Sequence, residues 1–225
     1  MTESASGQVD AVVASAEQAP TFIEILIDET GSMGGVKGAT ITAFNDFIKD
    51  QKQAEAACQV TMTKFSTTRV ITPYEMIDLS MVPDLTPATF NPGGGTNLYD
   101  TIVMRCRDLS EKVGSLPCNV LFLVITDGED TSSRHSPATV RETLCEKMSA
   151  GWTFVYLGAY ESALKVALSM GFPENNIKAF SATDAEVSKA LHQTSAATTA
   201  YRSARASGAI SVGTSSMGYF TGGEE

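Results

Sequence analysis

Five oxygen-bearing side chains in three short polar stretches have the chemistry to bind a hard divalent cation together. The stretches are residues 28–32 (Asp-Glu-Thr-Gly-Ser), 94–97 (Gly-Gly-Thr-Asn) and 126–128 (Thr-Asp-Gly). Mg²⁺ takes six oxygen ligands in a tight octahedron and usually keeps some water. Carboxylates and neutral hydroxyls both supply such oxygens, and the candidate ligands are Asp28, Thr30, Ser32, Thr96 and Asp127.

Each stretch also has an ordinary structural interpretation, and residues 30–32 are equally compatible with a strand-to-helix turn. Asp127 followed by Gly128 is typical of a simple turn. The glycines at 93–95 are compatible with a plain flexible loop, and Thr96 or Asn97 with the N-cap of a following helix. The alternate positions 28, 30 and 32, however, can point to the same side of an extended loop. The joint occurrence of the three stretches therefore favours a metal site over three unrelated turns.

The pattern of apolar residues predicts the elements that position these stretches. Continuous or alternating apolar runs indicate buried strands, and runs with helical spacing indicate amphipathic helices. The predicted strands are 21–27, 59–65, 69–74, 119–125, 152–157 and 177–180, with 69–74 paired to 59–65 as a hairpin. The predicted helices are 36–57, 97–113, 137–150, 162–170 and 184–203, and an irregular segment covers 75–92.

This alternation predicts an α/β fold, with a doubly wound, mostly parallel sheet, helices on both faces and one short antiparallel edge strand. Ligands of such sheets bind at the carboxyl ends of the strands, where the chain order reverses. Asp28 and Asp127 follow the first strand and the most apolar strand, so we expect them at that edge.

The three stretches resemble the motifs of von Willebrand factor A domains, also called integrin inserted-type domains. Residues 28–32 are similar to the D-x-[ST]-x-S motif, the glycines before Thr96 to the second loop, and residues 125–128 to the third. The resemblance covers residues 22–203 and implies a Rossmann-like fold with a metal-ion-dependent adhesion site. It also implies Mg²⁺ or Mn²⁺ as the ion, with one coordination position left for a partner's carboxylate. Thr30 replaces the family's commoner serine and keeps its hydroxyl.

Enzyme motifs fail at particular residues. A P-loop needs Gly-Lys followed by Ser or Thr, but Lys37 lies between a valine and a glycine. An aspartyl-phosphate phosphatase needs a second aspartate two positions after the first, where this chain has Thr30. No dinucleotide fingerprint and no G-x-S-x-G elbow is present. A metal hydrolase built on Asp28 and Asp127 stays open, although the sequence offers no evident general base.

Composition limits the remaining classes. The chain has 225 residues, of which 43% are hydrophobic, and a formal net charge of −10. This charge argues against nucleic-acid binding, which needs clustered Lys and Arg. We expect the acidic Glu29, Glu129 and Asp130 beside the site to be solvated surface charges, rather than groups that select cations or partners. The four cysteines lack the spacing of a zinc site and are expected to be buried free thiols.

The domain organisation follows from these patterns. Residues 1–20 are predicted to be a flexible leader, 21–204 the domain and 205–225 a Gly/Ser-rich tail that is extended or disordered without a partner. The start of the chain lacks the features of a signal peptide, and no apolar run reaches membrane-spanning length. We therefore expect a cytoplasmic protein that binds neither membranes nor nucleic acid.

Three functional hypotheses follow, in this order. The first is a metal-dependent adaptor that captures an Asp or Glu carboxylate of a protein partner, and the resemblance suggests an AAA+ ATPase or an assembly component. The second is a structural component of a larger bacterial or phage assembly, with both tails docking onto neighbours. The third is a metal-assisted enzyme, and we expect no enzymatic activity.

Overall fold

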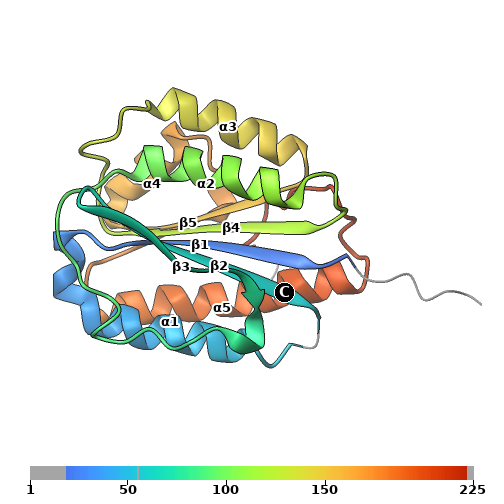
Figure 1. The fold of residues 1–225 in the computed structure, drawn as a ribbon, viewed down its shortest axis with the longest axis horizontal. Coiled ribbons are helices and arrows are strands. Elements are labelled where there is room, and N and C mark those ends of the chain that lie inside the picture. The colour runs from blue at the N-terminus through green and yellow to red at the C-terminus, as the bar shows by residue number, and fades with distance from the viewer. Residues whose placement is uncertain (1–18, 55, 222–225) are drawn as a thin grey trace, which may run out of the picture.

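Strands β1 (Thr21–Asp28) and β4 (Asn119–Thr126) lie side by side in the middle of a six-stranded sheet (Figure 1). The computed structural model describes residues 19–54 and 56–221. The other elements are the 3-10 helix η1 (Gly31–Val36), α1 (Lys37–Gln51), β2 (Cys58–Ser66), β3 (Arg69–Asp78), η2 (Leu79–Met81), α2 (Leu98–Val113), α3 (Pro137–Ser149), β5 (Thr153–Ala159), α4 (Tyr160–Ser169), η3 (Glu174–Asn176), β6 (Ile177–Phe180) and α5 (Asp184–Ala206).

The sheet has the order β3-β2-β1-β4-β5-β6 and is parallel except for the β2–β3 pair. Every residue of β1 and β4 is buried, as expected for strands covered on both faces. Helices α1 and α5 cover one face, and α2, α3 and α4 cover the other (Figure 1). The predicted fold class is therefore confirmed. The direction of winding reverses between β1 and β4, which defines the switch point of the sheet.

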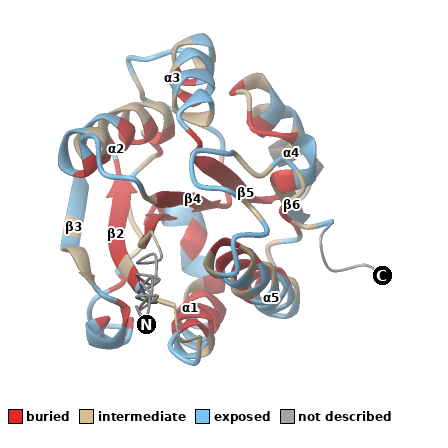
Figure 2. Cartoon of the chain, turned by 90° about the vertical axis from the view of Figure 1, so that its right-hand side faces the viewer, coloured by how far each residue is buried: buried red, intermediate tan, exposed pale blue. Residues whose placement is uncertain are grey.

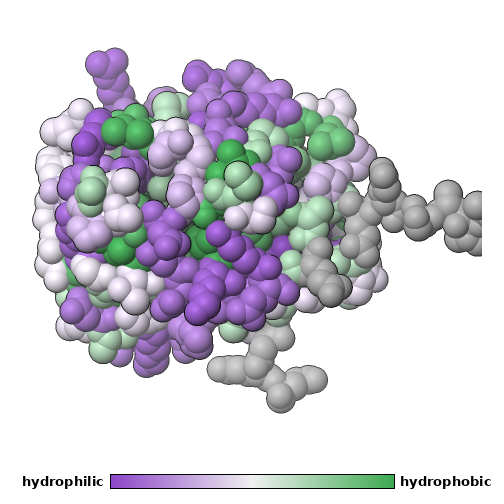
Figure 3. Space-filling view, turned by 60° about the horizontal axis from the view of Figure 1, so that its bottom comes forward, coloured by the Kyte–Doolittle hydropathy of each residue, from purple (hydrophilic) through white to green (hydrophobic). Residues whose placement is uncertain are grey.

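Burial follows these layers. Figure 2 shows buried residues on the central strands and on the inward sides of the helices, with the outer sides exposed. The outer face over α1 and α5 is largely hydrophilic, with small apolar areas scattered over it (Figure 3). None of the helices in the described part of the chain combines the length and hydropathy needed to cross a membrane.

The edge strand β3 is longer than predicted and extends to Asp78 instead of ending at residue 74. Its pairing with β2 shifts register twice, between Val60 and Met62 and again between Met62 and Lys64. Pro73 is tolerated because an edge strand leaves some backbone N–H groups unpaired. The bulges and the proline broke the alternating pattern on which the prediction of this strand depended.

Helix α1 is shorter than predicted, because it begins at Lys37 and ends at Gln51. The preceding residues form η1, which carries the chain from the end of β1 into the helix. Beyond the helix, the buried side chain of Arg202 donates to the carbonyl oxygens of Gln51 and Ala56, both at 2.7 Å. These bonds satisfy carbonyls that a continued helix would have used.

Helix α3 begins as predicted. The hydroxyl of Ser136 accepts a hydrogen bond from the backbone N–H of Thr139 at 3.2 Å, and Pro137 occupies the first turn.

All four cysteines are free, as expected, but only Cys58 and Cys106 are buried. Cys145 is exposed on α3, because the helix turns this side away from the sheet.

The segment after α5 packs against the domain. Tyr219 is buried, and its N–H donates to Asn176 Oδ1 at 2.9 Å. The Asn176 amide in turn donates to the carbonyl of Ser216 at 2.7 Å, and the tyrosine hydroxyl bonds to Thr198 on α5. The expectation of an extended or disordered tail is therefore wrong for residues 216–220. Residues 222–225 and the predicted leader up to residue 18 lie outside the described residues.

Candidate metal centre

The five candidate ligands lie at the carboxyl edge of the sheet, beside its switch point. Asp28 is the last residue of β1, and Asp127 follows directly after β4. Thr30 and Ser32 lie where the chain turns from β1 into η1, and Thr96 lies two residues before the first residue of α2. Parallel strands β1 and β4 pair in register from Thr21 with Asn119 onward, so their ends meet.

Three of the side chains form a continuous chain of oxygen atoms. The hydroxyl oxygens of Thr30 and Ser32 are 3.0 Å apart. The Ser32 hydroxyl also donates to Asp127 Oδ1 at 2.7 Å. Thr30 is buried, whereas Ser32 is exposed, so the cluster opens to solvent on the serine side.

Asp28 lies beneath this cluster and is fully buried. Its Oδ1 accepts from the backbone N–H of Thr30 at 2.7 Å, and its Oδ2 accepts from the hydroxyl of Thr126 at 2.6 Å. Burial raises the pKa of Asp28 from 3.8 to about 6, although both hydrogen bonds oppose the rise. Burial also raises the pKa of Asp127. Both carboxylates therefore lack a full counter-charge, which a bound cation would supply.

Thr96 reaches the same space from the opposite loop. A methyl group placed on Gly128 would lie 3.5 Å from the Thr96 hydroxyl oxygen and 3.9 Å from that of Ser32. The two hydroxyls therefore border one small region beside this glycine. The backbone of Thr96 is held by Thr131, whose hydroxyl accepts from the Thr96 N–H at 2.9 Å and whose N–H donates to the Thr96 carbonyl at 2.9 Å.

The glycine loop before Thr96 has fixed neighbours, so the interpretation as a plain flexible loop is wrong. Gly94 has a φ of +82°, which favours glycine, and a Cβ there would lie 3.0 Å from a methyl group of Thr68. The Gly94 carbonyl accepts from the N–H of Gly31 at 3.0 Å. The N–H of Gly95 donates to the Thr67 hydroxyl at 2.9 Å. The loop is thus bonded to both the β1–η1 turn and the β2–β3 turn.

The residues fit a hard divalent cation. Adjacent ligands of an octahedral Mg²⁺ ion, each about 2.1 Å from the metal, lie about 3.0 Å from one another. The separations of 3.0 Å between Thr30 and Ser32 and 2.7 Å between Ser32 and Asp127 are close to this value. The described residues contain no group of three or more His, Cys, Asp or Glu side chains that suits a metal. The donor set is therefore two carboxylates and three hydroxyls.

Glu29 is not the solvated surface charge that the sequence suggested. Only 1% of the residue is exposed, and its carboxylate forms ion pairs with Lys64 at 3.4 Å and Arg69 at 3.0 Å. The alternation along residues 28–32 turns Glu29 away from the ligands and toward β2 and β3. The available signal was Lys64, a single charge within an otherwise uncharged, buried strand.

The other two acidic residues differ from one another. Glu129 is exposed, as expected. Asp130 is half-buried, and its carboxylate accepts from the backbone N–H of Tyr99 at 3.2 Å and of Ser133 at 3.0 Å. It therefore joins the loop after β4 to the first turn of α2. Asn97 occupies the N-cap position of α2, but its side chain makes no capping hydrogen bond there.

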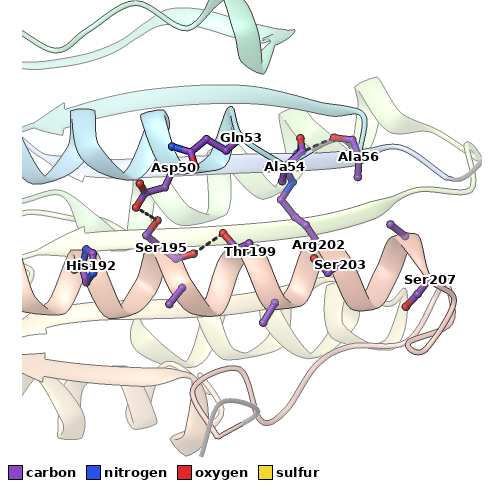
Figure 4. A pocket seen from close by; sticks show the side chains of 13 residues that line it. Asp50, Gln53, Ala54, Ala56, His192, Ser195, Thr199, Arg202, Ser203 and Ser207 are labelled. Atoms are coloured by element: carbon purple, nitrogen blue, oxygen red, sulfur yellow. Dashed lines mark hydrogen bonds between the residues drawn. The ribbon is translucent and has the colours of Figure 1, made fainter.

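A separate hollow of about 880 Å³ lies between α5 and the end of α1 (Figure 4). Arg202 and Asp50 line it, and Asp50 accepts from the Ser195 hydroxyl at 2.8 Å. None of the five candidate ligands borders this hollow, because it lies toward the opposite edge of the sheet, where β1 begins.

Comparison with known proteins identifies the fold. No family model and no curated protein matches the sequence. Among solved structures, the ArnB paralog VWA2 from Sulfolobus acidocaldarius is similar at 16% identity with a TM-score of 0.55. The pilus adhesin SpaC from Lactobacillus rhamnosus GG is similar at 13% identity with a TM-score of 0.58. Proximal thread matrix protein 1 from the mussel byssus, with a zinc-occupied MIDAS motif, is similar at 14% identity with a TM-score of 0.57.

These alignments cover 79–81% of this chain but only 30–46% of the matched chains, so this chain spans less than half of their length. At such low identity the likeness concerns the fold alone. The chain has the fold of a von Willebrand factor A domain.

Proposed function

We propose that this chain is a protein-binding domain that contacts its partner through a divalent cation, Mg²⁺ or Mn²⁺. The ion is held by Asp28, Thr30, Ser32, Thr96 and Asp127. The observation that carries this proposal is the run of oxygen atoms from Thr30 through Ser32 to Asp127, at separations of 3.0 and 2.7 Å. Two similar structures support it, since one has zinc at its MIDAS motif and the other is a pilus adhesin.

The chemistry of the donor set favours an acidic partner. When bound, the cation acts as a Lewis acid for one additional oxygen ligand, because five protein groups leave an octahedral shell incomplete. Three of the five groups are neutral hydroxyls, so the two carboxylates balance the charge of a divalent ion without exceeding it. An Asp or Glu side chain of a partner can therefore complete the shell. The exposed Ser32 lies on the side from which that residue approaches.

The partner class follows the same argument. We propose a protein surface that presents an Asp or Glu, such as that of an AAA+ ATPase or another assembly component, in the cytoplasm. Membranes, nucleic acids and catalysis form no part of this proposal. One argument for the alternative, a structural component whose tails dock onto neighbours, is weaker, because residues 216–220 pack against their own domain.

A capture experiment tests the proposal. Tagged protein incubated with lysate in Mg²⁺ should retain a partner that EDTA releases. Asp28→Ala and Thr96→Ala should each abolish retention, whereas Thr42→Ala, an exposed threonine on α1, should not. A partner that stays bound in EDTA and in both variants would refute metal-dependent binding and would favour the structural alternative. Phosphate-ester hydrolysis that disappears in Asp127→Ala would instead favour a metal-assisted enzyme.

A further inference from the structure

Glu29 lies between two candidate ligands in the sequence, but its side chain faces the interior. Its Oε1 accepts from the backbone N–H of Asn91 at 2.6 Å and lies 3.4 Å from Lys64 Nζ. Its Oε2 accepts a hydrogen bond from Arg69 Nε at 3.1 Å, and Arg69 Nη2 lies 3.0 Å from the same oxygen. One buried carboxylate is thus held by two cations and a backbone amide from three different segments.

The backbone of Glu29 strengthens the same connections. Its N–H donates to the carbonyl of Phe65 at the end of β2, at 2.9 Å. Its own carbonyl accepts from the N–H of Gly93, also at 2.9 Å. Arg69, besides binding the carboxylate, donates to the Asn91 carbonyl at 3.1 Å. Glu29 therefore links the first ligand loop to the segment that leads directly to Thr96.

The spatial consequence concerns the distance between the two ligand loops. Asp28, Thr30 and Ser32 belong to the segment that contains Glu29, whereas Thr96 lies three residues beyond Gly93. The contacts of Glu29 with Asn91 and Gly93 fix the start of that second loop relative to the first. Side chains behind metal ligands commonly set ligand orientation in this way, and their loss typically weakens metal binding 10- to 100-fold.

We propose that Glu29, clamped by Lys64 and Arg69, is a positioning residue that sets the separation between Thr96 and the ligands at 28, 30 and 32. This inference rests on the proposed metal site and adds to it a residue that does not touch the ion. Arg69 lies at the start of β3, and its side chain is 39% exposed. It then supports metal binding without touching the ion, by holding the Glu29 carboxylate in place.

The chain supplies a matched control on the same strand. Glu24 in β1 is also fully buried, and its carboxylate accepts from Arg105 Nε at 2.8 Å. Its partners Arg105 and Thr63 belong to α2 and β2, and neither contact involves the ligand loops. Loss of this carboxylate should disturb the fold as loss of Glu29 does, without changing the geometry of the ligands.

Metal titration of four proteins separates positioning from simple electrostatics. The full chain, Glu29→Gln, Arg69→Gln and Glu24→Gln would each be titrated with Mn²⁺ and Mg²⁺ by calorimetry. Loss of an acidic charge near the site weakens cation binding by Coulomb's law alone, and loss of a basic charge strengthens it. Positioning predicts instead that both Glu29→Gln and Arg69→Gln weaken binding by about tenfold or more. Glu24→Gln should bind within about twofold of wild type.

Amide hydrogen exchange in the metal-free proteins provides a second readout. The N–H groups of Gly93 and Gly95 are bonded to the Glu29 carbonyl and to the Thr67 hydroxyl. Their exchange should accelerate about tenfold or more in Glu29→Gln and Arg69→Gln, relative to the amides of β4 in the same protein. In Glu24→Gln the ratio should stay at the wild-type value.

The outcomes are distinguishable. Arg69→Gln that binds metal as tightly as wild type, or more tightly, would overturn the positioning role while leaving the proposed function intact. Unchanged exchange at Gly93 and Gly95 in Glu29→Gln would overturn it independently of any metal. A wild-type chain that binds neither Mn²⁺ nor Mg²⁺ would refute the proposed function itself.

Discussion

The hydroxyl of Ser32 donates to the carboxylate of Asp127 over 2.7 Å, although 95 positions separate the two residues. The bond joins η1, which follows β1, to the residue that follows β4, and β1 and β4 are the two central strands. It directs the proton of the serine hydroxyl toward the carboxylate, so an oxygen lone pair stays free for a cation.

Divalent cations should stabilise the protein. An ion that binds only the folded state adds about 2.7 kcal/mol when its concentration is 100 times its Kd. The thermal midpoint should therefore rise in millimolar Mg²⁺ or Mn²⁺ and fall again in EDTA. Ser32→Ala and Thr96→Ala should lose most of this shift, whereas Thr42→Ala should keep it. No shift in the wild-type protein at these concentrations would argue against an intact site.

Gly128→Ala should separate metal binding from stability. The added methyl group would lie 3.5 Å from the Thr96 hydroxyl oxygen, an ordinary van der Waals distance, so the fold should tolerate it. The methyl group would, however, occupy space beside the hydroxyls of Thr96 and Ser32. We expect the free energy of unfolding in EDTA to change by less than about 1 kcal/mol, and the metal affinity to fall by about tenfold or more. If Gly128→Ala lowered the free energy of unfolding in EDTA as much as it lowered the free energy of metal binding, the glycine would be needed for the backbone conformation and not for the space around the ion.

Burial of Asp28 should contribute a loss of stability to the metal-free protein as the pH rises from 4 to 7. The pKa of Asp28 is about 6 in the folded protein and 3.8 as its ordinary value, because the carboxylate is buried. The folded state therefore binds more protons than the unfolded state in this range, and stability is lost as the proton dissociates. The difference corresponds to roughly 3 kcal/mol at 1.36 kcal/mol per pH unit.

Denaturant unfolding in EDTA across this pH range measures that effect. Asp28→Asn should unfold at higher denaturant concentration than wild type at pH 7 and should lose the metal-induced shift. Metal affinity of the wild type should fall as the pH drops below about 6, because protons compete for the same carboxylate. Parallel stability profiles for wild type and Asp28→Asn would contradict the burial argument.

Tyr219 should contribute strongly to stability despite its place near the end of the chain. It is buried against Tyr201 with ring centroids 6.2 Å apart, and it bonds to Thr198 and Asn176. Tyr219→Ala should cost about 3 kcal/mol of unfolding free energy, the usual cost of deleting a large buried ring. Met217→Ala, two residues earlier and exposed, should cost less than about 0.5 kcal/mol. Equal midpoints for the two variants in denaturant would show that the tail adds nothing to the fold.

The predicted elements succeeded where one physical signal dominated. The strongly apolar runs of β1 and β4 favour strands buried on both faces, as in a parallel sheet with helices on each side. The predictions failed where several weak effects compete. The bulges of β3 break the alternation of an edge strand. The end of α1 near Gln51 and the packing of Tyr219 depend on contacts with distant segments.

The sequence by itself determined the donor chemistry of the site. Oxygen atoms at residues 28, 30, 32, 96 and 127, placed after apolar strands, suit a hard cation whatever the remaining contacts are. Only the tertiary structure decided how Glu29 is used, because its burial depends on cations supplied by β2 and β3. Local patterns specify which side of a strand a residue faces. Which charge meets it there depends on how strands far apart in the sequence pair.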